Sequence, residues 1–261
     1  RGEWRLSPGY ENDNSGFSRP VYIECLSCHS GKVESLDGGR AKFAVRQLAI
    51  DCERCHGPGS EHSAYWQANA EPPPEGDATI VNPARLARRE GESICSQCHF
   101  DTYAESDVRG RDYLKYLPGQ AIDDYRVHYT LTGGDRDPRG EEMRIVGHAE
   151  QLHLSRCYQK SETLTCSTCH DAHAAAPADK VAAYRAKCLD CHQEETCNAP
   201  GTDRQQANDN CMVCHMPPTN TEIPHVAATH HRIGVRGRSK PPAPIGLTPL
   251  TDVSSLPQLD R

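Results

Sequence analysis

This sequence of 261 residues is poor in the side chains that usually fill a protein interior. It contains three Phe and two Trp, its hydrophobic residues amount to 36%, and its mean hydropathy is −0.73. A chain of this composition buries too little apolar surface to offset the entropy cost of folding. An ordinary large hydrophobic core is therefore excluded, and a stable fold needs another apolar body at its centre.

Long hydrophobic runs are also missing. None reaches the roughly 20 residues that a transmembrane helix needs, so we expect no transmembrane segment. The chain carries 29 Lys and Arg against 36 Asp and Glu, which gives a formal net charge of −7. Because a negative surface repels phosphates, nucleic acid is not expected as a partner.

Cysteine and histidine are abundant instead, with fourteen of each. The pattern Cys-x-x-Cys-His occurs six times and takes up twelve of the fourteen cysteines. The cysteines are Cys25 and Cys28, Cys52 and Cys55, Cys95 and Cys98, Cys166 and Cys169, Cys188 and Cys191, and Cys211 and Cys214. The histidines that follow them are His29, His56, His99, His170, His192 and His215.

Cys-x-x-Cys-His is the attachment pattern of c-type haem. The two thiols add to the haem vinyl groups, and cysteines three apart in one helical turn point the same way, with the histidine placed to ligate the iron. Pairs of Cys-x-x-Cys also build zinc sites, but six histidines at the same offset are not a coincidence. The sequence therefore predicts six covalently attached haem c groups.

Six haems also supply the missing apolar interior, since the chain offers about 44 residues for each of them. We expect a mainly α-helical protein with extensive loops, in which short helices wrap around a stack of haems, with at most one small β-hairpin. Residues 1–24 read as an N-terminal arm, 25–231 as a hexahaem cytochrome c domain, and 232–261 as a Pro-rich C-terminal tail.

Local patterns predict several elements within that frame. Gly57-Pro58-Gly59 ends the second motif's turn, and 126–132 alternates like a strand with 142–146 as its hairpin partner. Thr202-x-x-Gln205 has the form of a capping box. Helices are expected over 41–51, 61–69, 84–89 behind an Asn82 cap, 148–157 and 179–193.

Eight histidines lie outside the motifs and are candidates for the second axial position of each iron: His62, His128, His148, His153, His173, His225, His230 and His231. With only three methionines, His/Met ligation is at most a minority. His128 lies on the polar side of its strand. His148 and His153 are about 140° apart on a helix, so both cannot serve one haem. His230 and His231 are adjacent, which leaves room for one ligand.

Compartment follows from the chemistry. Covalent haem attachment of this type is completed outside the cytoplasm, and the chain begins with Arg1, as expected after removal of a signal peptide. We therefore expect a periplasmic or extracellular protein. Cys157 and Cys197 belong to no motif, and in an oxidising compartment they form either a disulfide or two buried free thiols.

Several stretches resemble the hexahaem c-type cytochrome module found with tetratricopeptide repeats, which is related to the nitrifier tetrahaem cytochrome family. They are 52–59 (CERCHGPG), 147–151 (GHAEQ), 155–157 (SRC), 166–173 (CSTCHDAH), 211–217 (CMVCHMP), 223–225 (IPH) and 231–233 (HRI). The resemblance covers roughly residues 22 to 233. It implies that Cys157 and Cys197 pair, and that the distal ligands include His62, His148, His173, His225 and His231.

The resemblance leaves the sixth distal ligand open among His128, His153, His230 and a histidine of a neighbouring subunit. His230 stands where the family more often has an aspartate.

Bis-histidine ligation closes both axial positions, which is typical of electron transfer rather than catalysis. We expect an electron carrier, not an enzyme, that serves redox partner proteins or extracellular electron acceptors. It either acts alone or assembles into an electron-conducting filament. The alternative is a reductase or dehydrogenase of small nitrogen or sulfur oxides, which requires one five-coordinate haem.

Overall fold

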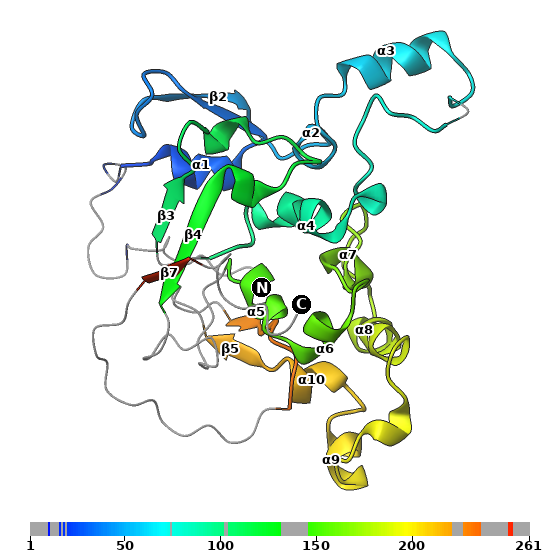
Figure 1. Ribbon diagram of the computed structural model, residues 1–261. Helices are drawn as coiled ribbons and strands as arrows, with labels where there is room; N and C mark the ends of the chain where they lie inside the picture. Colours follow the sequence, from blue (N-terminus) through cyan, green and yellow to red (C-terminus); the bar gives the residue numbers. More distant parts are fainter. Residues whose placement is uncertain are drawn as a thin grey trace. The chain divides into compact units, whose positions relative to one another are not determined.

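The computed structural model describes residues 10, 16, 18, 20–73, 75–101, 104–131, 146–220, 227–235 and 250–252. The chain is mostly helical, with 40% helix and 11% strand, and consists of many short helices, long loops and small two-strand hairpins (Figure 1). The predicted fold class, mainly helical with extensive loops, is confirmed at this level.

The helices and strands are short throughout. The α-helices are α1 (Ile23–His29), α2 (Glu53–His56), α3 (Ser60–Ala68), α4 (Arg88–Ser96), α5 (Ala149–His153), α6 (Arg156–Lys160), α7 (Cys166–Cys169), α8 (Lys180–Leu189), α9 (Gly201–Gln206) and α10 (Cys211–His215). The 3-10 helices are η1 (Pro83–Arg85), η2 (Tyr113–Lys115), η3 (Ile122–Asp124) and η4 (Glu194–Thr196). The strands are β1 (Lys32–Ser35), β2 (Phe43–Gln47), β3 (Ala104–Asp107), β4 (Arg126–Leu131), β5 (Pro218–Asn220), β6 (Ala227–Thr229) and β7 (Leu250–Asp252).

The chain forms two compact units. Unit 1 comprises Arg1–Cys98 and Ser106–Val127, and unit 2 comprises His99–Glu105 and His128–Arg261. The third motif is divided between them, because its cysteines belong to unit 1 and His99 belongs to unit 2.

Unit 1 contains a β-hairpin where the sequence predicted a helix. β1 and β2 pair antiparallel, with Val33 opposite Val45 and Ser35 opposite Phe43. The helix expected over 41–51 was wrong because Phe43 and Val45 alternate with smaller or polar residues and pack as strand residues do. Val33 of β1, opposite Val45, is only 4% exposed. Burial gained by pairing with β1 therefore outweighs the loose helical periodicity of residues 41–51.

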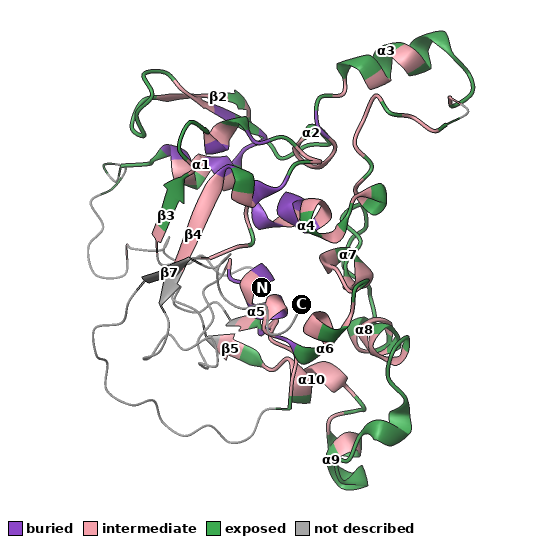
Figure 2. Ribbon diagram, in the orientation of Figure 1, coloured by how far each residue is buried: buried purple, intermediate pink, exposed green. Residues whose placement is uncertain are grey.

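The interior of unit 1 is small and rich in tyrosine. Tyr113, Tyr116, Ile122 and Tyr125 form its hydrophobic cluster. The Tyr113 hydroxyl donates to the backbone carbonyl of Gln97 at 2.7 Å, so this buried ring keeps a partner for its polar end. Among the described residues, burial is concentrated in α4 and in the segments around it, while α3 is largely exposed (Figure 2).

The strand predicted over 126–132 is confirmed as β4, but its partner is different. Residues 142–145 of the predicted hairpin lie outside the described residues. β4 instead pairs antiparallel with β7, Tyr129 opposite Asp252 and Leu131 opposite Leu250, in a sheet of order β3-β4-β7. β5 and β6 form another antiparallel pair. The expectation of at most one hairpin was therefore wrong, and a strand lies within the predicted tail.

The helices of unit 2 follow the sequence in part. The helix predicted over 179–193 is α8, and Asp179 caps it by accepting from the backbone nitrogen of Ala182 at 3.0 Å. The helix predicted over 148–157 is broken into α5 and α6, because the backbone of Ser155 is extended, with φ −79° and ψ 133°. Its fully buried hydroxyl donates to the carbonyl of His231 at 3.3 Å and accepts from the backbone nitrogen of Ile233 at 2.8 Å.

Two of the remaining cap predictions differ in outcome. Asn82 caps η1 by accepting from the backbone nitrogen of Ala84 at 3.0 Å, but this helix ends at Arg85 and α4 begins afresh at Arg88. The capping box expected at Thr202 was wrong, because α9 begins one residue earlier, behind Pro200. The helix predicted over 61–69 is confirmed as α3.

Candidate functional site: attachment motifs and axial histidines

All six Cys-x-x-Cys-His motifs begin in a helical turn, as their spacing predicts. They start in α1, at the N-cap of α2, and in α4, α7, α8 and α10. In three motifs the histidine backbone nitrogen donates to the first cysteine's carbonyl: His56 to Cys52 at 2.9 Å, His170 to Cys166 at 3.0 Å and His192 to Cys188 at 2.9 Å. Each such turn presents both thiols on one side of the helix.

In unit 1, the thiols of different motifs lie side by side. A hydrogen bond between Cys28 and Cys98 raises the pKa of Cys28 and lowers that of Cys98. Burial raises the pKa of Cys55, and the nearby Cys95 raises it further. The first three motifs therefore converge on one place.

Arg54 lies at that place. Its guanidinium donates through Nη1 to the carbonyl of Gly31 at 3.5 Å and through Nη2 to the carbonyl of Ser27. Its Nε is buried and has no hydrogen-bond partner among the described atoms. Its positive charge lowers the pKa of Cys28 and of Cys98. Arg54 thus ties the second motif to the first and adds a positive charge among the thiols.

Unit 2 repeats this convergence with the last three motifs. Burial, together with the neighbouring Cys211 and Cys169, raises the pKa of Cys188 to about 11. Cys157 belongs to the same group, since burial and the nearby Cys191 raise its pKa. Cys197 is exposed, and neither it nor Cys157 is disulfide-bonded in the structure. The disulfide that the resemblance implies is absent from the structure.

Four histidines of unit 2 form a cluster. The ring centres of His99 and His148 are 4.9 Å apart, and those of His148 and His231 are 4.6 Å apart. The rings of His170 and His231 are 6.1 Å apart with an interplanar angle of 27°. Burial lowers the pKa of His99 and His148, and it lowers that of His231 to about 4. Those three rings are therefore neutral at pH 7 and keep a lone pair for a metal.

This cluster fits axial ligation of iron. Imidazoles on opposite sides of one metal have ring centres about 6 Å apart, given metal–nitrogen bonds of about 2 Å. The pair of His170, which follows the fourth motif, and His231 has that separation. The Nδ1 of His148 is buried without a hydrogen-bond partner among the described atoms, as expected where a bound group completes the environment.

Four further contacts fix the tautomer of candidate ligands. His56 Nδ1 bonds the carbonyl of Val81 at 2.8 Å, His215 Nδ1 that of Gly234 at 3.2 Å, and His231 Nδ1 that of Thr229 at 2.8 Å. His62 Nδ1 bonds a carboxylate oxygen of Asp77 at 2.6 Å. Each ring then carries its proton on Nδ1 and has its lone pair on Nε2, the arrangement that metal-bound histidines usually show.

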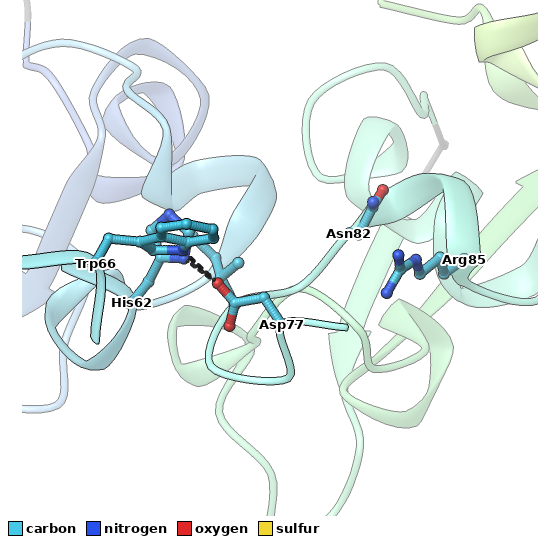
Figure 3. Close-up of a pocket in the computed structure, with 6 residues that line it drawn as sticks. His62, Trp66, Asp77, Asn82 and Arg85 are labelled. Atoms are coloured by element: carbon cyan, nitrogen blue, oxygen red, sulfur yellow. Dashed lines mark hydrogen bonds and ion pairs between the residues drawn. The ribbon is translucent and has the colours of Figure 1, made fainter. Parts of the chain in front are cut away.

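His62 lines a pocket of about 410 Å³ beside the second motif. His62 and Trp66 come from α3, and Asp77, Ile80, Asn82 and Arg85 from the following segment (Figure 3). His56 is adjacent, since its ring bonds Val81, the residue between Ile80 and Asn82. The pocket therefore lies next to the histidine of the second motif and contains a candidate distal ligand and a cationic side chain.

The other candidates are placed less favourably. His173 is exposed, with its Nδ1 3.8 Å from Asp171, and His225 lies outside the described residues. His128 and His153 both contact Phe100, at 4.8 Å and 6.3 Å between ring centres. His230 is fully buried and accepts from the backbone nitrogen of Arg232 at 3.1 Å. Of the adjacent pair, His231 is thus the one directed at other histidines.

Four of the six helices that carry the motifs have little protein packed against them. In α2, α7, α8 and α10 none of the residues is buried, unlike in α1 and α4. Helices with no fully buried residue gain little stability from packing, so they need another apolar surface. Large planar apolar groups attached at their cysteines fit this requirement.

Neither a site for a lone metal ion nor a membrane-spanning helix is found in the described part of the chain. No three His, Cys, Asp or Glu side chains converge there on a point that could hold a lone metal ion. No described helix is long and apolar enough to cross a bilayer. No protein-family model matches the chain, and no curated protein or solved structure shows significant similarity to it.

Sequence reasoning missed several residues of the site. Arg54 was visible as the charged residue inside Cys52-Glu53-Arg54-Cys55, but its contacts with the first motif depend on the fold. Asp77 gave no signal, because it lies fifteen residues from His62 in a loop. Phe100 and Ser155 likewise act through contacts between distant segments.

Proposed function

We propose that this protein is a multihaem c-type cytochrome that transfers electrons along six closely packed haems. The observation that carries the proposal is the contact between attachment cysteines of different motifs, Cys28 with Cys98 and Cys188 with Cys211. Groups bound at neighbouring thiols are themselves neighbours. A haem iron with two histidine ligands changes oxidation state without binding a substrate, and this is the chemistry the cofactor supplies.

The chain's own residues hold and tune these groups. The twelve motif cysteines attach them, and His29, His56, His99, His170, His192 and His215 ligate the irons. His62, His148, His173, His225 and His231 are proposed as distal ligands. His231 has the best support, because its ring centre lies 6.1 Å from that of His170, whereas His148 lies against His99 at 4.9 Å. Nδ1 hydrogen bonds orient the rings of His56, His62, His215 and His231.

Unit 1 has too few histidines to give each of its irons a second axial ligand. Unit 1 contains three histidines, His29, His56 and His62, of which the first two belong to motifs. Only His62 is then left within unit 1 for the first two irons. Unit 2 has seven non-motif histidines for four motif histidines. One of the first two haems therefore takes its second ligand from elsewhere in the chain or from another copy, or keeps an open position.

These possibilities separate two versions of the function. A histidine donated by another copy fits a subunit of an extracellular electron-conducting filament. An open iron fits the alternative, a reductase or dehydrogenase of small nitrogen or sulfur oxides with one five-coordinate haem. In either version we propose a periplasmic or extracellular location, with redox proteins or extracellular electron acceptors as partners.

An absorption spectrum of the dithionite-reduced protein tests the proposal. We expect a c-type α band and, in alkaline pyridine, six haems per chain. Absence of the band refutes the proposal and returns zinc to consideration. Carbon monoxide then decides between the versions: an unchanged spectrum means six closed irons and an electron carrier, and a shift of about one haem in six means an open iron. Negative-stain images at high protein concentration test assembly into filaments.

A further inference from the structure

The Asp77 carboxylate is held by more partners than a loop residue needs. Its Oδ2 accepts from His62 Nδ1 at 2.6 Å and from Trp66 Nε1 at 2.8 Å. Its Oδ1 accepts from the backbone nitrogen of Thr79 at 2.8 Å and from the Thr79 hydroxyl. In Figure 3 the His62 and Trp66 side chains lie beside each other on one side of the Asp77 carboxylate, and Asn82 and Arg85 lie on the other side.

These bonds fix the position of the Asp77 carboxylate. Thr79, Trp66 and His62 all donate to it, so both of its oxygens are held. Its side chain is 15% exposed and that of His62 is 37% exposed, so water competes only partly for the contact. Because Thr79 fixes one oxygen, the other is directed at His62 without further loss of side-chain freedom.

The partner of His62 differs in charge from those of three other candidate ligands. The Nδ1 atoms of His56, His215 and His231 bond backbone carbonyls, which are neutral. A carboxylate acceptor draws the Nδ1 proton further from the ring and makes Nε2 a more basic donor. A more basic axial ligand, with a negative charge behind it, stabilises ferric over ferrous iron.

We propose that Asp77 is a positioning residue that lowers the reduction potential of the one haem ligated by His62. This inference rests on the proposed function. It names the residue that gives one haem of the electron path a different reduction potential. Trp66 shares the oxygen that accepts from His62, so it moderates the effect, and Thr79 holds the carboxylate in place. Electron transfer to or from this haem then has a different driving force from electron transfer between the other haems.

The test is a redox titration of the haem-loaded protein followed by absorption and by EPR of the low-spin ferric haems. Asp77→Asn removes the charge and keeps one oxygen that can accept from His62, while its amide nitrogen replaces the oxygen that accepts from Thr79. We expect one potential in six to rise and one EPR signal to change. An approximately tenfold loss of preference for ferric iron corresponds to about 59 mV. Asp77→Glu, which keeps the charge, should restore a potential close to that of the wild type.

Trp66→Phe is the second variant and leaves Asp77 and His62 intact. It removes a competing donor from Oδ2, so the carboxylate becomes a stronger acceptor for His62. The same potential should therefore fall, opposite in sign to the effect of Asp77→Asn. Asp123→Asn is the matched control, because this carboxylate of the same unit pairs with Arg89 at 2.8 Å instead of a histidine. We expect all six potentials to stay unchanged in it.

Three results would overturn the inference. In the first, no potential moves in Asp77→Asn or Trp66→Phe. In the second, Asp77→Asn shifts all six potentials together. In the third, the Asp77→Asn shift persists in a His62→Met background, which means that the charge acts through space and not through the imidazole. Failure of the proposed function is seen separately, as a wild-type protein without a c-type α band.

Discussion

His230 and His231 are adjacent in sequence, yet the structure gives them opposite roles. His231 lies between His148 and His170, with ring centres 4.6 Å and 6.1 Å away, and its Nδ1 bonds the carbonyl of Thr229. His230 is fully buried, and its Nδ1 accepts from the backbone nitrogen of Arg232. We therefore expect His231 to ligate iron and His230 to stabilise the fold.

The two alanine variants should differ in kind. His231→Ala removes one axial ligand, so the reduced protein should bind carbon monoxide at about one haem in six, seen as a Soret shift of that amplitude. His230→Ala should leave the response to carbon monoxide as in the wild type. It removes the acceptor of the partly buried Arg232 backbone N–H, which costs about 1–3 kcal/mol of unfolding free energy, and the lost imidazole adds a cavity cost.

His230→Asn serves as the matched control. Its side-chain oxygen accepts from the backbone nitrogen two residues on, as in an Asx turn, and so replaces the lost bond. Stability in urea should then fall less than in His230→Ala. Carbon monoxide binding in His230→Ala, with none added in His231→Ala, would reverse the assignment and refute the reasoning.

Three further predictions concern the rest of the chain. Two thiols per chain should react with a thiol reagent in the unfolded, haem-loaded protein, because Cys157 and Cys197 are both free; a count of zero would mean that they are bonded. Gly57→Ala should lower the unfolding free energy by about 1–3 kcal/mol in urea, because Gly57 has φ 77° and ψ −174°, a region that only glycine adopts easily; an unchanged midpoint would contradict it. Asp179→Ala should cost about 1 kcal/mol by loss of the α8 cap and Asp179→Asn much less, and equal losses in the two variants would argue against capping.

Local chemistry decided which elements were predictable from the sequence. The turn at Gly57, the cap at Asn82 and the alternating strand β4 depend on neighbours in sequence, and all three were found. The helix expected over 41–51 failed because its residues pair with β1, a contact that no local pattern encodes. The partner of β4 lies more than a hundred residues away in β7, beyond the reach of any hairpin rule.

The candidate site divides in the same way. The helical turn of each attachment motif follows from its spacing alone, so it could be predicted from the sequence. The pairing of His170 with His231 and the contact of His62 with Asp77 join separate segments, and they needed the fold. The choice between His230 and His231 depended on burial, which adjacent identical residues cannot reveal.

The small tyrosine cluster of unit 1 has a consequence for how such a protein is made. Four residues, Tyr113, Tyr116, Ile122 and Tyr125, form that cluster, and most of the motif helices bury nothing. On the proposed function, a chain that has not yet received its cofactors has little to hold it together and is an easy substrate for proteases. Incomplete chains would then be degraded before they reach their partners, and iron supply would limit how much protein accumulates.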